Sequence, residues 1–182
     1  MLLHINILGL LISFLIYTPP KSSSDWVISL KLKEIKIEDR DFYIKSVSDK
    51  RQDSSNIGYL EGLWKNKTYL RLNGGAKKAF TEYLDKALPA DSSQIPVELT
   101  IKGIKATNDA GWGHISAIVE MELEFSWLNK EGDLEKVEVN VIKEKENLIK
   151  IAKRTYRKLL RDVLVSSLNQ LNNDLKAQSI TP

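Results

Sequence analysis

The chain has 182 residues, with 27 lysines and arginines against 24 aspartates and glutamates, which gives a net charge of +3. A charge balance this close to neutral argues against a dedicated nucleic-acid-binding protein. The chain contains no cysteine, which excludes disulfides, thiol nucleophiles and thiolate metal sites together. Its length fits one domain with a core large enough to fold without covalent cross-links.

The N-terminal segment gives the clearest indication of where the protein is located. Residues 1–17 (MLLHINILGLLISFLIY) are almost entirely apolar and contain no charged side chain, and residues 18–24 are small, polar or proline apart from one lysine. An apolar run followed by small polar residues is typical of a secretory signal peptide. We therefore expect an exported, periplasmic or envelope-associated protein, with residues 1–24 removed before Asp25 and one domain over residues 25–182. The alternative is an uncleaved N-terminal anchor, although a membrane-spanning helix needs about 20 apolar residues.

In the first half of the chain, the pattern predicts short strands and one helix. Apolar and polar residues alternate over residues 28–32, and a second strand is expected over residues 42–47. Residues 57–72 indicate one or two further extended pieces. A helix then begins at Asn73 or Gly74 and continues to Leu88, because its apolar residues recur at helical spacing.

The second half gives the strongest strand signal. From Ile115 to Trp127 every odd-numbered residue is apolar, while the even positions are glutamate and serine with the exception of Ile118. Side chains alternate between the two faces of a strand, so one face of this strand lies in the core. Residues 129–133 form a turn, and the valines of residues 137–141 can then pair with the strand in an antiparallel hairpin. With a third strand over residues 97–106, these segments predict a three-stranded antiparallel meander.

The last segment predicts a long helix that covers this meander. Apolar residues recur with 3.6-residue spacing from Leu148 to Leu175, with no proline or glycine between them. The order of strands, helix, three strands and long helix indicates an α+β fold. We expect a two-layer domain, in which an antiparallel sheet packs against one short helix and one long C-terminal helix.

Three groups of residues are candidates for contacts with a partner. Trp112 lies between two glycines in a predicted loop over residues 107–114, and tryptophan is favoured at binding hot spots. The alternative is that this side chain covers the open end of the core. Asp49 and Arg51 are placed to form a bidentate ion pair or a fork that binds a carboxylate. The alternative is a turn held by a local salt bridge.

The third group is the basic face of the long helix. It consists of Lys150, Lys153, Arg154, Arg157, Lys158 and Arg161. Each cation could gain up to about 1 kcal/mol near an anionic lipid surface, although a solvated charged face is the ordinary alternative. The row Glu120, Glu122 and Glu124 is in the same way expected to be a solvated face, matched by nearby lysines, in preference to a cation site.

The sequence names no residues for catalysis, for a metal or for a cofactor. It has no G-x-S-x-G motif, no pair of catalytic carboxylates and a lone histidine, His114, after the predicted cleavage site. The segment from Val47 to Arg51, followed by Ile57 and Gly58, resembles the D-x-R and glycine of the YajG-like lipoproteins of bacterial envelopes. The order of helix, meander and closing helix is similar over residues 27–175. The chain departs from these lipoproteins in lacking the lipidated cysteine.

This resemblance implies an envelope compartment and an α+β fold, and it carries no catalytic residues. We therefore expect a non-enzymatic exported protein that binds a protein or another envelope component, without a cofactor and without nucleic acid. One alternative is a peripheral membrane protein held by an uncleaved anchor and the basic helix face. A second alternative is a small-ligand binder or hydrolase of unknown type.

Overall fold

The computed structural model describes residues 25–62, 66–111, 114–147 and 152–180. Over these residues the protein has an α+β fold, in which seven strands form one sheet and two helices pack against it. The strands are β1 (Trp26–Ile28), β2 (Phe42–Asp49), β3 (Asn56–Glu61), β4 (Lys67–Leu72), β5 (Ile95–Gly111), β6 (His114–Leu128) and β7 (Leu134–Asn147). The helices are α1 (Gly75–Ala87) and α2 (Lys153–Ile180).

Strands β5, β6 and β7 form the expected antiparallel meander. The register places Leu123 between Ile101 of β5 and Val139 of β7, and all three side chains are buried. A bulge between Ile101 and Gly103 shifts the parity of β5, so that Ala106, an even-numbered residue, lies opposite buried Val119. Both strands of the first hairpin are longer than expected, and the prediction of a loop over residues 107–114 is wrong for most of this range, since β5 continues to Gly111 and β6 begins at His114. Residues 112 and 113 lie outside the described residues.

The sheet as a whole is mixed, which corrects the expectation of an antiparallel sheet. Strand β1 is parallel to β4, and both β2 and β3 pair in parallel with the same edge of β5. Strand β2 pairs with residues 95–101 of β5, and β3 meets β5 at Ala106. Parallel neighbours require a long connection, and α1 lies within the chain that connects β2 to β5. Alternation of side chains reports burial and does not report strand direction, so the sequence pattern could not show this.

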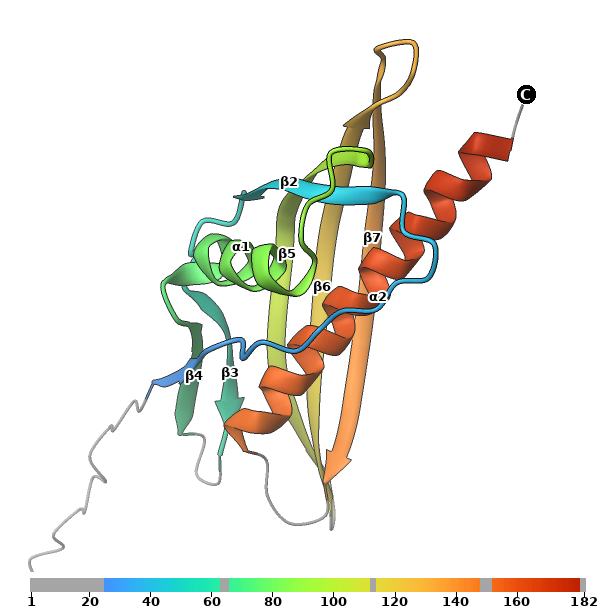
Figure 1. Cartoon of the computed structure of the whole chain (residues 1–182). Helices are drawn as coiled ribbons and strands as arrows, with labels where there is room; N and C mark the ends of the chain where they lie inside the picture. The colour runs from blue at the N-terminus through green and yellow to red at the C-terminus, as the bar shows by residue number, and fades with distance from the viewer. Residues whose placement is uncertain (1–24, 63–65, 112–113, 148–151, 181–182) are drawn as a thin grey trace, which may run out of the picture.

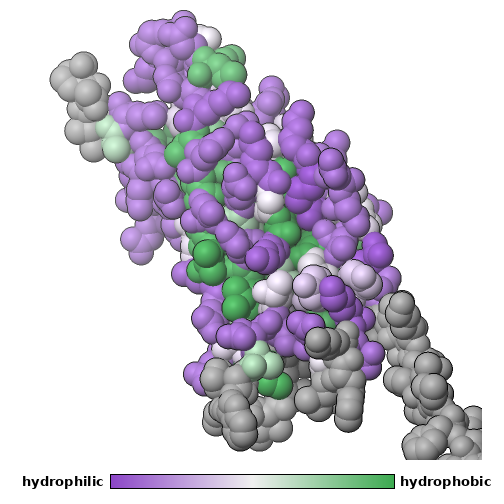
Figure 2. All heavy atoms as spheres, turned by 180° about the vertical axis from the view of Figure 1, so that it is seen from behind, coloured by the Kyte–Doolittle hydropathy of each residue, from purple (hydrophilic) through white to green (hydrophobic). Residues whose placement is uncertain are grey.

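The two helices lie on the same face of the sheet, as Figure 1 shows. Their apolar sides and the inward sides of the strands form one cluster of buried side chains. Phe80 of α1 and Leu160, Val163 and Leu164 of α2 are at most 1 % exposed. Full burial of a large apolar side chain contributes about 1.5–3 kcal/mol, so docking of the helices is a major source of stability. The view from behind is largely hydrophilic, with scattered hydrophobic patches (Figure 2).

A segment without regular secondary structure, residues 29–41, runs between the two helices, and we call it the strap (Figure 1). It is held through its backbone. Arg157 Nε donates to the Ser29 carbonyl at 2.8 Å, and Tyr83 Oη donates to the Lys33 carbonyl at 3.1 Å. Buried Ile35 adds a backbone bond to α1. The predicted strand over residues 28–32 is therefore largely absent, because these residues bond to helix side chains instead of to a neighbouring strand.

Candidate binding surfaces

Asp49 and Arg51 meet in a bidentate ion pair at the end of β2. Arg51 Nε donates to Asp49 Oδ1 at 2.9 Å, and Arg51 Nη2 donates to Asp49 Oδ2 at 2.8 Å. The guanidinium also donates to the carbonyls of Ser54 and Asn56, at 2.8 and 3.0 Å. The side chain of Arg51 is only 9 % exposed, and that of Asp49 is only 4 % exposed. This geometry favours the local salt bridge over a contact with a partner, because the fork is already occupied within the loop.

The rest of this loop is stabilised by short polar side chains. Asp53 Oδ1 accepts hydrogen bonds from the Asn56 amide at 3.1 Å, from the Ser55 hydroxyl at 3.0 Å and from the Ser55 amide at 3.1 Å, and these bonds hold the pKa of Asp53 below its ordinary value. The Asn56 side chain then accepts from the Gly58 amide at 2.9 Å. Asp and Asn side chains commonly form such turns by bonding to nearby amides. The loop fixes the position at which β3 begins beside β5.

The basic face of α2 is divided between the strap and solvent. Arg157 and Arg161 donate to strap carbonyls, and Lys153 Nζ lies 5.9 Å from the ring centroid of Trp26. Arg154 and Lys158 are exposed. Of the six basic residues predicted for this face, Lys150 lies outside the described residues. Two of the remaining five thus have a structural role that periodicity could not reveal, because the sequence does not show what crosses the helix.

The remaining predicted contacts are only partly described. Trp112 lies outside the described residues, so its role as a contact stays a prediction. The row of glutamates faces the open side of the sheet. Glu124 pairs with Lys102 at 2.9 Å and with Lys136 at 3.9 Å, which confirms the expected matching by lysines, although its side chain is only 15 % exposed. The hydrogen bond from Lys102, joined by other nearby lysines, lowers the pKa of Glu124.

An apolar surface that the sequence analysis did not single out lies at the far end of the meander. Leu128 and Leu134 are directly opposite each other across β6 and β7, and they are 62 % and 60 % exposed. With Pro96, Trp127 and neighbouring polar residues they line a hollow of about 230 Å³, which we call the distal groove. Both leucines flank the predicted turn over residues 129–133. The sequence signal that indicates this surface is a leucine on the outward face at the end of each of these two strands.

The distal groove has a charged rim. Lys45 and Glu98 line it, and their charged groups lie 3.7 Å apart. Both side chains are more than half exposed, so this pair contributes little to stability. In the view from behind, a hydrophobic patch lies at the end of the molecule that the β6–β7 turn forms, surrounded by hydrophilic surface (Figure 2). The groove can therefore take an apolar side chain while its rim contacts polar groups.

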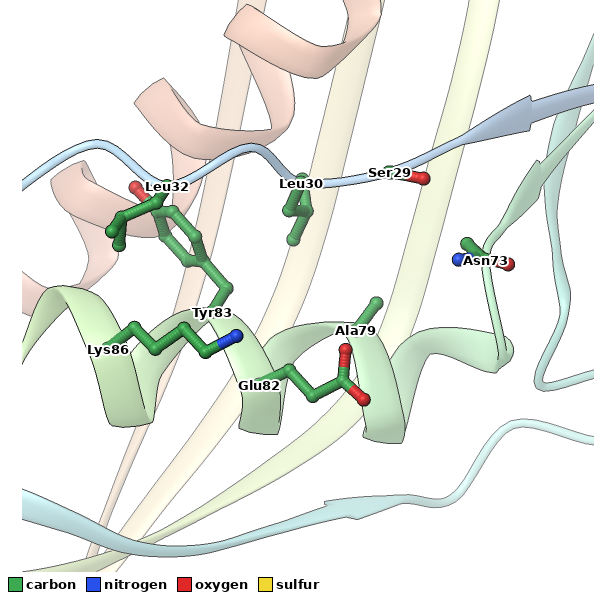
Figure 3. A pocket seen from close by; sticks show the side chains of 8 residues that line it. All are labelled: Ser29, Leu30, Leu32, Asn73, Ala79, Glu82, Tyr83 and Lys86. Atoms are coloured by element: carbon green, nitrogen blue, oxygen red, sulfur yellow. The ribbon is translucent and has the colours of Figure 1, made fainter.

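A second hollow lies between the strap and α1 (Figure 3). Leu30 and Leu32 extend into the space from the strap, opposite Ala79 and Tyr83 of α1. Its volume is about 110 Å³, whereas sites for small molecules usually measure about 300–1,000 Å³. Burial raises the pKa of the Tyr83 hydroxyl, which donates to the strap and is therefore engaged in structure.

The described part of the chain holds no group of three or more histidine, cysteine, aspartate or glutamate side chains arranged to bind a metal. Among the helices described, none is long and apolar enough to cross a membrane.

Comparison with known proteins gives structural likenesses only. No family model and no curated protein matches this chain. The fold is similar to the crystal structure of protein XCC0632 from Xanthomonas campestris, described by the family model DUF330, with a TM-score of 0.49 and 9 % sequence identity. The likeness covers 85 % of this chain and 99 % of that chain.

Proposed function

We propose that this chain is a non-enzymatic, exported envelope protein that binds a protein partner through the distal groove. The observation that carries the proposal is the pair Leu128 and Leu134, two large apolar side chains that lie together in the open. Single exposed apolar residues are ordinary on a protein surface, whereas a contiguous patch with a polar rim is typical of an interaction site. The two described helices lie on one face of the sheet (Figure 1), and Leu128 and Leu134 share the parity of the residues on the other face.

The dimensions and chemistry of the distal groove favour a protein over a small ligand. A hollow of about 230 Å³ accommodates one or two apolar side chains, and it is smaller than most sites for cofactors. Interfaces between proteins commonly combine an apolar centre with a polar rim. Here the leucines supply the centre, and Lys45 and Glu98 supply the rim.

The compartment is supported by the composition of the N-terminal segment. Residues 1–17 carry no charge and are followed by small polar residues and prolines, as in signals that are recognised during export. The absence of cysteine means that folding outside the cytoplasm requires no disulfide formation.

A crosslinking experiment with matched positions tests the binding surface. A photoreactive amino acid is placed at Leu128 or, as a control, at Leu32, which is also 62 % exposed but lies on the strap. After illumination of intact cells, the Leu128 position is expected to give a discrete adduct, and the adduct is expected to disappear when Leu134→Asp is added. Adducts of equal yield from both positions, or none from Leu128, would refute binding through the distal groove.

A second function, binding to an anionic membrane surface, is supported by the position of the strap. Arg161 holds the Lys31 carbonyl at 3.2 Å, so the exposed lysines of the strap run beside the exposed basic residues of α2. These exposed cations are Lys31, Lys33, Lys36, Lys153, Arg154 and Lys158. An anionic lipid surface attracts such clusters, and salt weakens the attraction.

Vesicle sedimentation separates this function from simple insertion of the N-terminal segment. The full chain is compared on phosphatidylserine-containing and pure phosphatidylcholine vesicles at low and high salt. Lipid-surface binding predicts a salt-sensitive preference for the anionic vesicles that Arg154→Glu with Lys158→Glu abolishes. The same charge change at Lys77 and Lys78, which are exposed on α1, should leave it intact. Equal binding to the two kinds of vesicle would refute binding to an anionic membrane surface.

A further inference from the structure

The outer edge of β7 is a long, regular strand edge. β7 is the last strand in the sheet order, and it has only β6 as a described partner. Its 14 residues contain neither proline nor glycine, and its pairing with β6 runs from Leu134 to Asn147 without a bulge. A strand edge of this kind presents a row of backbone amides and carbonyls to which another strand can pair.

The side chains of β7 determine which strand fits this edge. Counted outward from Asn140, the charges are opposite at equal distances: Lys136 corresponds to Glu144, and Glu135 corresponds to Lys145. An antiparallel pair related by a two-fold axis at Asn140 would set these residues directly across from each other. The axis repeats each pairing, so four opposite-charge pairs form, and opposite-charge pairs stabilise neighbouring strands.

We propose that β7 is a self-recognition edge, through which two copies of this chain pair antiparallel and continue one sheet across the dimer. Such a dimer is isologous, because both copies contribute the same edge. Pairing over residues 135–145 would add about ten backbone hydrogen bonds, since alternate opposite pairs in an antiparallel ladder exchange two. The two-fold axis is perpendicular to the sheet, so the helices of both copies lie on one side and the open faces on the other.

The charge pattern also selects one register. With the axis at Asn140, Val139 of one copy lies opposite Val141 of the other, and no like charges meet. Moving the axis to Val139 leaves half as many opposite-charge pairs. Moving it to Val141 sets Glu138 against Glu144 on both sides, and like charges directly opposite each other destabilise a strand pair. The lysines and glutamates that protect the edge from unspecific pairing thus favour pairing with a second copy.

Three side chains of the pairing segment are exposed, namely those of Glu144, Lys145 and Ile142, the last at 59 %. In Figure 1, α2 crosses the sheet obliquely, and its C-terminal end extends beyond β7 in that view. In the dimer this end of each α2 would therefore lie over the sheet of the other copy.

Two charge-swap variants of the full-length chain test the inference without changing net charge. The first carries Glu144→Lys and Lys145→Glu, and the second carries Glu135→Lys and Lys136→Glu. Each variant alone would place like charges at all four pairs, so its dimer dissociation constant is expected to rise roughly ten-fold or more. Mixed in equal amounts, the two variants restore every opposite-charge pair, and sedimentation equilibrium should then show a heterodimer about as stable as the native dimer.

A cysteine crosslink tests the position of the axis, because the chain has no cysteine of its own. Cysteines introduced by Asn140→Cys would meet across the axis at a distance that a disulfide can span. Oxidation is expected to give a covalent dimer with Asn140→Cys and little with Lys130→Cys, an exposed position in the β6–β7 turn. A monomeric native chain with equal crosslinking of the two variants would overturn the inference. A native dimer that neither charge swap weakens would also overturn it, because the copies would then meet elsewhere.

Discussion

The ion pair between Asp49 and Arg51 gives the sharpest test of how the first half of the fold is stabilised. Arg51→Ala would remove both bonds to Asp49 and the bonds to the carbonyls of Ser54 and Asn56. The Asp49 side chain is only 4 % exposed, so its charge would remain buried without its partner. Removing one member of a buried ion pair typically costs about 3–5 kcal/mol. We expect a loss of that size in the free energy of unfolding.

Urea denaturation, followed by circular dichroism, measures this loss. The control is Arg71→Ala. Arg71 Nε lies 2.8 Å from Asp25 Oδ2, the same distance as the closest contact between Arg51 and Asp49, but the side chains of Arg71 and Asp25 are 36 % and 41 % exposed. An exposed pair is usually worth about 0–1 kcal/mol, and the bond from Arg71 Nη1 to Ser55 Oγ, at 2.8 Å, adds about 1 kcal/mol, so Arg71→Ala should cost about 2 kcal/mol or less. If Arg51→Ala lost about 1 kcal/mol or less with an unchanged urea dependence, the structural role of this pair would be refuted.

Three further predictions concern other parts of the fold. Gly58→Ala should prevent folding or cost more than about 3 kcal/mol in the free energy of unfolding by urea denaturation. The reason is that an added Cβ would lie 2.0 Å from the Ala106 carbonyl oxygen of β5, and that Gly58 has a φ of +137°. A fully stable variant would disprove this close approach. Tyr156→Phe should cost about 1 kcal/mol, because the buried hydroxyl donates to the Thr107 carbonyl at 2.8 Å, and no change would mean that the bond is not formed. The folded-state pKa of Glu124 is lowered from 4.5, chiefly by its hydrogen bond from Lys102. The contribution of Glu124 to the free energy of unfolding is therefore complete above pH 4.5 and is lost as the pH falls through the lower folded-state pKa. Thermal unfolding at a series of acidic pH values should show a smaller loss of stability for Glu124→Gln than for the native chain, and equal losses would contradict this prediction.

The elements of the second half could be predicted because each has one dominant period. Strand β6 alternates apolar and acidic residues, and α2 repeats its leucines every three or four residues, so their existence and buried faces follow from the sequence. The hairpin register also follows, because slipping by one residue would turn Val139 outward.

The strand order and the strap could not be predicted in this way. The pairing of β2 with β5 joins residues about 50 positions apart, and strand periodicity carries no information on such partners. The strap alternates like a strand over residues 28–32, yet its carbonyls accept hydrogen bonds from Arg157 and Arg161. Helical periodicity alone therefore indicates a free basic face for the same arginines. The distal groove does not follow from the sequence pattern, because the alternation of β6 and β7 does not show that the leucines at the two strand ends lie together in the open.

The proposal that this chain acts outside the cytoplasm can be tested most directly with one introduced cysteine, placed away from the distal groove so that a bound partner does not cover it. Leu32→Cys would place the sole thiol of the chain on the strap, at a position that is 62 % exposed in the native residue. Cells with a permeabilised outer envelope and an intact inner membrane are treated with a membrane-impermeant thiol reagent, and labelling is compared with that after complete lysis. We predict labelling in the intact cells nearly as extensive as after lysis. Labelling only after lysis would contradict export.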